Sequence, residues 1–106
     1  MKFLFFGLFL IFQTSHAEDL RTFALSVKDG KFTPERIEVP RDKKFKLEVK
    51  NDGNQSEEFE SVELNREKIV GPHKSITVFL GPLGTGEYVF FGDFHPDTAR
   101  GKIVVK

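Results

Sequence analysis

Apolar residues alternate with polar ones in short segments along most of the chain, and a turn dipeptide such as Asp29-Gly30 or Gly81-Pro82 follows many of them. An apolar residue at every second position is typical of a half-buried β-strand. Segments of this kind cover 23–27, 32–34, 37–39, 45–49, 76–80, 88–91 and 103–105. Only 57–69 is ambiguous, and no window keeps a helical period. The pattern predicts an all-β, antiparallel sandwich of about seven to eight strands.

The first residues depart from this pattern. A positive charge at Lys2 precedes an apolar run over 3–12, and 13–17 ends in small and polar residues. This order is typical of a cleaved secretory signal peptide, with the cut expected after Ala17. The run is too short for a membrane-spanning helix, which needs about 20 apolar residues. We therefore expect a signal peptide over 1–17 and a single exported domain over 18–106.

Composition narrows the functions that this domain can have. The full chain carries 16 basic and 16 acidic side chains, and loss of Lys2 with the signal leaves 15 against 16. Such a balance gives no general electrostatic attraction to nucleic acid. The chain contains no cysteine, which excludes thiolate metal sites and cysteine nucleophiles. The serines lie near no histidine motif, which disfavours a hydrolase.

Candidate chemistry gathers in two places. The loop Gly92-Asp93-Phe94-His95 follows an apolar strand, and the ambiguous segment opens with Glu57-Glu58-Phe59-Glu60. Side chains alternate faces along a strand, so Glu57 shares a face with Phe59, while Glu58 shares the other with Glu60. If Phe59 is in the core, Glu57 points towards it. His73, in a Gly-Pro-His-Lys turn, is expected to be exposed and non-ligating.

Several motifs together resemble the cupredoxins. They are Asp29-Gly30-Lys31-Phe32-Thr33-Pro34, Ile37-Glu38-Val39-Pro40, Asn51-Asp52, Gly86-Glu87-Tyr88, Gly92-Asp93-Phe94-His95-Pro96 and Gly101-Lys102-Ile103-Val104-Val105. Within that family, Glu57-Glu58-Phe59-Glu60-Ser61 and Arg66-Glu67-Lys68-Ile69-Val70 resemble a narrower group. It comprises the periplasmic cupredoxin-like proteins of bacterial iron uptake, kin to the cupredoxin domain of EfeO and to small partners of FTR-type iron permeases. The resemblance implies a Greek-key β-sandwich in the periplasm, with Tyr88 as the structural tyrosine that closes it through a backbone hydrogen bond.

The resemblance also implies a metal site whose ligands are not those of blue copper. Gly92 stands at the position of the cysteine, His95 at that of the second histidine, and the only methionine is the initiator. Carboxylates with one imidazole form a hard ligand set that suits iron or Cu(II) and is poor for Cu(I). Blue-copper electron transfer is therefore excluded. The candidate ligands are Glu58, His95, Glu67, Asp93 and Glu57. The pattern of the iron-uptake group favours Glu58, whereas strand parity favours Glu57, and the choice stays open here.

The implied role is binding of iron, copper or both, with assistance to Fe(II) oxidation as a further expectation. The implied partners are the metal ion, an inner-membrane iron permease and a periplasmic iron-binding protein. Nucleic acid is not an expected partner, because the charge balance gives no attraction to it. Two alternatives remain: a metal carrier without redox turnover, and a metal-free interaction module of cupredoxin fold. The sequence does not specify an oligomeric state.

Overall fold

The computed structural model describes residues 20–106, and this part of the chain contains nine β-strands and no helix. The strands are β1 (Arg21–Lys28), β2 (Lys31–Thr33), β3 (Arg36–Val39), β4 (Phe45–Asn51), β5 (Glu57–Ser61), β6 (Arg66–Val70), β7 (Ser75–Leu80), β8 (Gly86–Gly92) and β9 (Arg100–Val105). The predicted all-β sandwich is confirmed, but it is not antiparallel throughout, because two of the seven strand pairs are parallel. The count is nine because the ambiguous segment 57–69 forms most of a hairpin, β5 and β6, and because β2 is a separate strand of only three residues.

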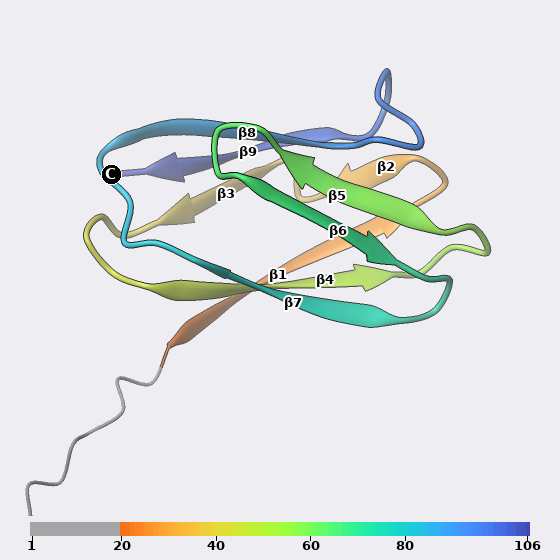
Figure 1. Cartoon of the computed structure of the whole chain (residues 1–106), viewed down its shortest axis with the longest axis horizontal. Coiled ribbons are helices and arrows are strands. Elements are labelled where there is room, and N and C mark those ends of the chain that lie inside the picture. Colours follow the sequence, from red (N-terminus) through yellow and green to blue (C-terminus); the bar gives the residue numbers. More distant parts are fainter. Residues whose placement is uncertain (1–19) are drawn as a thin grey trace, which may run out of the picture.

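The strands form two sheets that pack face to face (Figure 1). One sheet has the order β2-β1-β4-β7, and the other has the order β3-β9-β8-β5-β6. β1 pairs with β4 and β3 pairs with β9 in parallel, while the remaining pairs are antiparallel. Four of the seven pairs join strands that are not consecutive in sequence, namely β1–β4, β4–β7, β3–β9 and β5–β8, so the chain repeatedly crosses between the sheets. These crossings place the start of β5 beside the end of β8.

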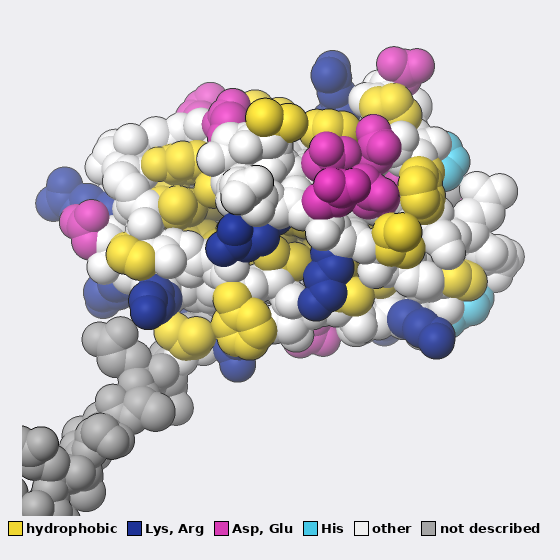
Figure 2. All heavy atoms as spheres, viewed as in Figure 1, with side chains coloured by type: hydrophobic (Ala, Val, Ile, Leu, Met, Phe, Trp, Pro, Cys, Tyr) yellow, Lys and Arg dark blue, Asp and Glu magenta, His cyan; other side chains and the backbone are white. Residues whose placement is uncertain are grey.

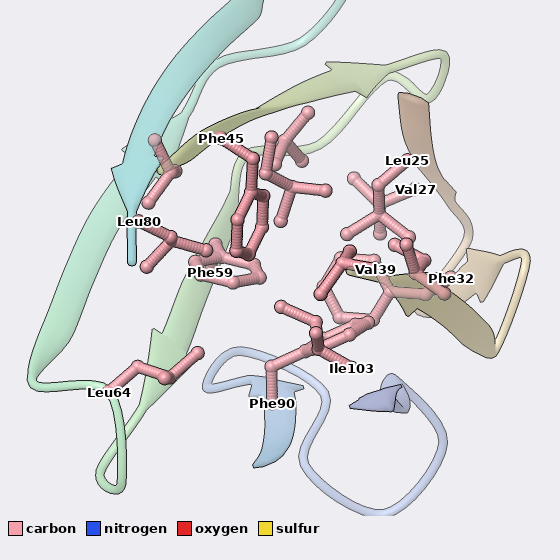
Figure 3. Packing of buried hydrophobic residues seen from close by; sticks show 14 of the residues in the cluster. Leu25, Val27, Phe32, Val39, Phe45, Phe59, Leu64, Leu80, Phe90 and Ile103 are labelled. Carbon is pink, nitrogen blue, oxygen red and sulfur yellow. The ribbon is translucent and has the colours of Figure 1, made fainter. Parts of the chain in front are cut away.

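The core fills the space between the sheets with one side chain in every two (Figure 3). In β4, Phe45, Leu47 and Val49 are buried, while the residues between them face outwards. At the end near β5 and β8, the rings of Phe32, Phe59 and Phe90 pack together at centroid distances of 5.2 to 6.3 Å. Such aromatic pairs add about 0.5–1.5 kcal/mol each beyond the area that they bury.

Two expectations about single residues are confirmed by the fold. Tyr88 donates from its hydroxyl to the carbonyl of Gly84 at 2.9 Å, which closes the turn before β8 as predicted. His73 is exposed, and its Nε2 contacts Asn54 Oδ1 at 2.9 Å. The predicted signal peptide over 1–17 lies outside the described residues, and so do the first two residues of the predicted mature domain. Within residues 20–106 no helix has the length and apolar character needed to cross a membrane.

Candidate metal centre

β5 carries the two rival acids of the sequence to opposite faces of its sheet. Glu57 is 3% exposed and Glu58 is 8% exposed, yet they have different surroundings. Glu57 shares the inner face with Phe59, which is fully buried. Glu58 shares the outer face with Glu60, as strand alternation predicts. The candidate residues are thereby divided between an inner site and an outer site.

The inner site is a hydrogen-bonded pair formed by Glu57 and His95. His95 Nδ1 donates to Glu57 Oε2 at 2.6 Å. Glu57 Oε1 accepts from the backbone N–H of Phe94 at 2.9 Å and from that of Glu58 at 3.1 Å. The buried carboxylate is therefore satisfied by three donors. Such satisfaction is what allows a polar side chain to be buried without a large cost.

Gly92 makes room for this carboxylate. A Cβ atom at Gly92 would lie 2.7 Å from both Cδ and Oε1 of Glu57, and 2.8 Å from the Cβ of Ala99. Real Cβ atoms do not approach other atoms so closely, so any larger residue at 92 would have to displace the acid. The buried position of Glu57 thus depends on the absence of a side chain at Gly92. The Glu57 carboxylate lies where a side chain from residue 92 would begin.

This inner site does not fit a blue-copper ion. The position that supplies sulfur in the resembled proteins is Gly92, and the ring nitrogen His95 Nδ1 is already bonded to Glu57. The cavity beside the pair, lined among others by Gly30 and Asn51, has a volume of about 10 Å³. That is the space of about one water-sized sphere, with no room for a metal and a further ligand. Within residues 20–106, every fully buried side-chain nitrogen or oxygen has a hydrogen-bond partner.

The outer site is a cluster of carboxylates on the exposed face of β5 and on the loop after β8. Glu58, Glu60 and Asp93 each offer a carboxylate oxygen, and these oxygens lie within 4.8 Å of one another. Glu67 on β6 is directly opposite Glu60 in the hairpin, and its carboxyl is among those whose charge acts on Glu58. We call Glu58, Glu60, Glu67 and Asp93 the acidic cluster. Figure 2 shows acidic side chains gathered in one compact patch on this face, bordered by hydrophobic ones.

The basic residues closest in sequence do not neutralise the acidic cluster. Arg66 and Lys68 flank Glu67 on β6, but strand alternation turns them the other way. Arg66 donates from Nε and Nη2 to the carbonyl of Phe79 at 3.2 and 3.1 Å, and Lys68 donates to that of Thr77 at 3.2 Å. Both cations thus cover the free edge of β7. Among the ion pairs of residues 20–106, none involves a member of the acidic cluster.

Its surroundings change the acidity of Glu58. Burial raises the pKa of Glu58 from 4.5 to about 7, with further contributions from the neighbouring Glu67 carboxyl and from the charges of Asp93 and Glu60. A carboxyl group in such surroundings keeps its proton to a higher pH than usual, and a bound cation favours its ionised form. Glu58 is therefore a residue whose carboxyl is directed into a group of acids on the surface, with no partner of opposite charge among the described residues.

The structure brings together only part of the predicted ligand set. Glu58 and Asp93 meet in the acidic cluster, and Glu67 joins them from β6. His95 and Glu57 are outside this group and bond to each other instead. Glu60 was absent from the predicted set, although it shares the outer face with Glu58. Its two-residue spacing from Glu58 was the sequence signal for its inclusion.

Comparison with known proteins agrees with the fold. The sequence profile of the cupredoxin-like domain matches residues 2–105, almost the whole chain. The chain belongs to the cupredoxin-like domain family. A relative of this chain is the uncharacterized protein RP394 of Rickettsia prowazekii (strain Madrid E), which is 52% identical over 81 residues. That match covers 76% of this chain and spans 65% of the length of the relative.

Solved cupredoxin-like structures resemble the two-sheet sandwich at low sequence identity. Auracyanin A, a blue copper protein of Chloroflexus aurantiacus, has a TM-score of 0.68 at 13% identity, covering 80% of this chain and 98% of its own. The metal-binding domain of the Cu(I)-exporting P-type ATPase CopA of Streptococcus pneumoniae D39 has a TM-score of 0.67 at 14% identity, with coverage of 80% and 84%. The likeness shows the cupredoxin fold alone.

Proposed function

We propose that this cupredoxin-like protein binds a hard metal cation at the acidic cluster. We propose further that this cation is iron, which an inner-membrane permease then takes up. In this proposal the protein is exported to the periplasm by its signal peptide and serves as an accessory of the permease. Iron is its cargo. Cu(II) is the alternative ion, because carboxylate oxygen also binds it well.

The observation that carries the proposal is the unneutralised Glu58 within the acidic cluster. Three carboxylates within reach of one point, with a fourth beside them, supply anionic oxygen, the ligand type that suits iron and Mn(II) better than Cu(I). Oxygen ligands favour ferric over ferrous iron, so the same site would ease oxidation of bound Fe(II). The resemblance to iron-uptake proteins supports iron as the cargo. The cluster lies on the surface, where cargo can enter and leave.

Metal titration of the mature chain, residues 18–106, tests this function. Anaerobic Fe(II), Mn(II) and Cu(II) are each added while isothermal calorimetry measures heat and stoichiometry. Saturable binding of Fe(II) or Mn(II) is expected, with strong loss in Glu58→Gln. The matched control is Glu63→Gln, which removes an exposed acid of the turn between β5 and β6 and leaves binding unchanged. Equal binding by Glu58→Gln and the unmodified chain would contradict the proposal.

Oxidation is tested separately from binding. Fe(II) consumption in air is compared between the mature chain and Glu58→Gln at equal protein concentration. A rate above that of buffer, lost in Glu58→Gln, supports assistance to Fe(II) oxidation. A rate equal to that of buffer assigns the protein a carrier role without redox turnover.

A second candidate function has one observation in its favour. Phe94 and Ile69 are large apolar side chains that remain 46% and 57% exposed beside the acidic cluster. Ile69 pairs directly with Glu58 across the hairpin, and Phe94 follows Asp93. Exposed apolar groups around a charged centre are typical of a protein-binding surface. A metal-free interaction module would show no saturable metal binding in the titration above.

A further inference from the structure

We infer that Glu57 is a positioning residue for the acidic cluster: it fixes the two backbone segments that carry Glu58 and Asp93. This inference rests on the proposed binding of a cation at that cluster. Glu57 itself takes no part in binding, because its carboxylate is directed inwards and bonded to three donors. Its effect reaches the surface through the backbone.

The connection runs through two N–H groups. One belongs to Glu58, a member of the cluster, and the other to Phe94, the residue after the cluster member Asp93. The same oxygen, Glu57 Oε1, accepts both. It therefore joins β5 to the loop after β8 at the point where each segment presents an acid to the outside.

Two further bonds complete this connection. The N–H of Asp93 donates to the carbonyl of Glu58 at 2.9 Å, which pairs the two cluster members directly through their backbones. His95, held at its ring by Glu57, begins a tight loop in which its carbonyl accepts from the N–H of Ala99 at 2.8 Å. The loop that carries Asp93 is thus fixed from both sides. Without Glu57, the loop after β8 would be joined to β5 by the bond between Asp93 and Glu58 and by the β5–β8 strand pairing that precedes it, with no side-chain bond holding Phe94.

Like-charged side chains need such support. Carboxylates held close together repel one another until a cation or protons arrive, so their backbones tend to move apart. A residue that holds them at binding distance lowers the cost of assembling the site when the cation binds. Residues that orient metal ligands without contacting the metal typically contribute about 10- to 100-fold in metal affinity. We expect a contribution of that size from Glu57.

The experiment compares Mn(II) affinity of the mature chain with that of three variants, all shown to be folded by circular dichroism. Glu57→Ala removes every bond of the carboxylate. Glu57→Gln keeps an oxygen that accepts from the two N–H groups. Ser61→Ala is the matched control on the same strand and face: it removes a buried side chain that donates to Val89 at 2.7 Å and accepts from Leu64, away from the cluster.

The expected result is a loss of about 10- to 100-fold in Mn(II) affinity for Glu57→Ala, with Glu57→Gln and Ser61→Ala close to the unmodified chain. If Glu57→Ala does not fold, His95→Ala carries the test, since it removes one of the three donors and is expected to weaken Mn(II) binding more than Ser61→Ala does. Unchanged affinity in the Glu57 or His95 variant, with Mn(II) bound by the unmodified chain, would overturn the inference alone. Absence of saturable Mn(II) binding by the unmodified chain would overturn the proposed function and this inference together.

Discussion

Glu57 and Glu58 are adjacent in the sequence and both are buried, yet their environments differ in every other respect. Glu57 has three hydrogen-bond donors and lies beside the core. Glu58 is surrounded by other acids, and its pKa rises to about 7 because of burial and their charge. Because successive side chains of a strand face opposite sides of the sheet, a structural carboxylate and a candidate ligand can be adjacent residues. Burial alone therefore does not distinguish the two acids, whereas the kind of neighbour does.

The comparison also explains the missing sulfur. In the resembled copper proteins a cysteine stands at the position of Gly92, and here the space that its side chain would need holds the Glu57 carboxylate. The inner site has thus become part of the hydrogen-bonded framework. The proposed ligands are one residue away, on the outside of the same strand. In this proposal the carboxylate ligands differ from those of the copper proteins in place as well as in type.

The largest expected effect comes from filling the inner site. Gly92→Ala places a methyl group 2.7 Å from the Glu57 carboxylate, which must then leave its donors. Overpacking costs about 1–3 kcal/mol, and the displaced buried acid adds to that loss. Urea unfolding should show a lower midpoint for Gly92→Ala. Gly84→Ala is the control, because a Cβ there meets nothing within 4 Å. Equal midpoints for the two variants would mean that Glu57 does not depend on Gly92.

The outer site predicts an unusual dependence of stability on pH. Because the native pKa of Glu58 is raised from 4.5 to about 7, the native state binds more protons than the unfolded state between these values. The free energy of unfolding without metal should therefore fall as pH rises through this window. Urea unfolding of the unmodified chain and of Glu58→Gln at a series of pH values checks this. The fall should be smaller in Glu58→Gln, and identical pH profiles would contradict the assignment.

Added cation should reverse the same effect. Above its raised pKa, Glu58 is ionised, and Mn(II) bound at the acidic cluster stabilises the native state by mass action. Thermal unfolding at a pH above 7 should therefore shift to higher temperature as Mn(II) is added, and the shift should shrink as the pH falls below that value. A Mn(II) effect that does not depend on pH would place the cation away from Glu58.

The smallest expected effect concerns the second histidine of the described chain. His73 is exposed and its ring hydrogen-bonds to Asn54, so His73→Gln should change stability by less than about 0.5 kcal/mol. Mn(II) affinity should not change either. The same titration and urea unfolding measure both. Loss of Mn(II) binding in His73→Gln would show that the cation is bound by the turn and not by the acidic cluster.

Much of the fold follows from the sequence because alternation and turn dipeptides are local signals. The strand 45–49 and the inward direction of Glu57 were both set by period two. The hairpin of β5 and β6 was ambiguous, because its outer positions carry acids and its β6 residues are mostly exposed. The sequence could not predict that His95 lies apart from Glu58, since this depends on the hydrogen bond between His95 and Glu57, which are 38 positions apart. The turning of Arg66 towards β7 likewise requires the packing of the two sheets.

The most direct test of the central claim asks which atoms contact the cation. Pulsed electron paramagnetic resonance of Mn(II) bound to the mature chain detects nitrogen of a coordinated imidazole. The account predicts oxygen coordination without histidine nitrogen, and loss of the bound signal in Glu58→Gln. Nitrogen modulation that persists in His73→Gln and disappears in His95→Ala would place the cation at His95 and contradict the account.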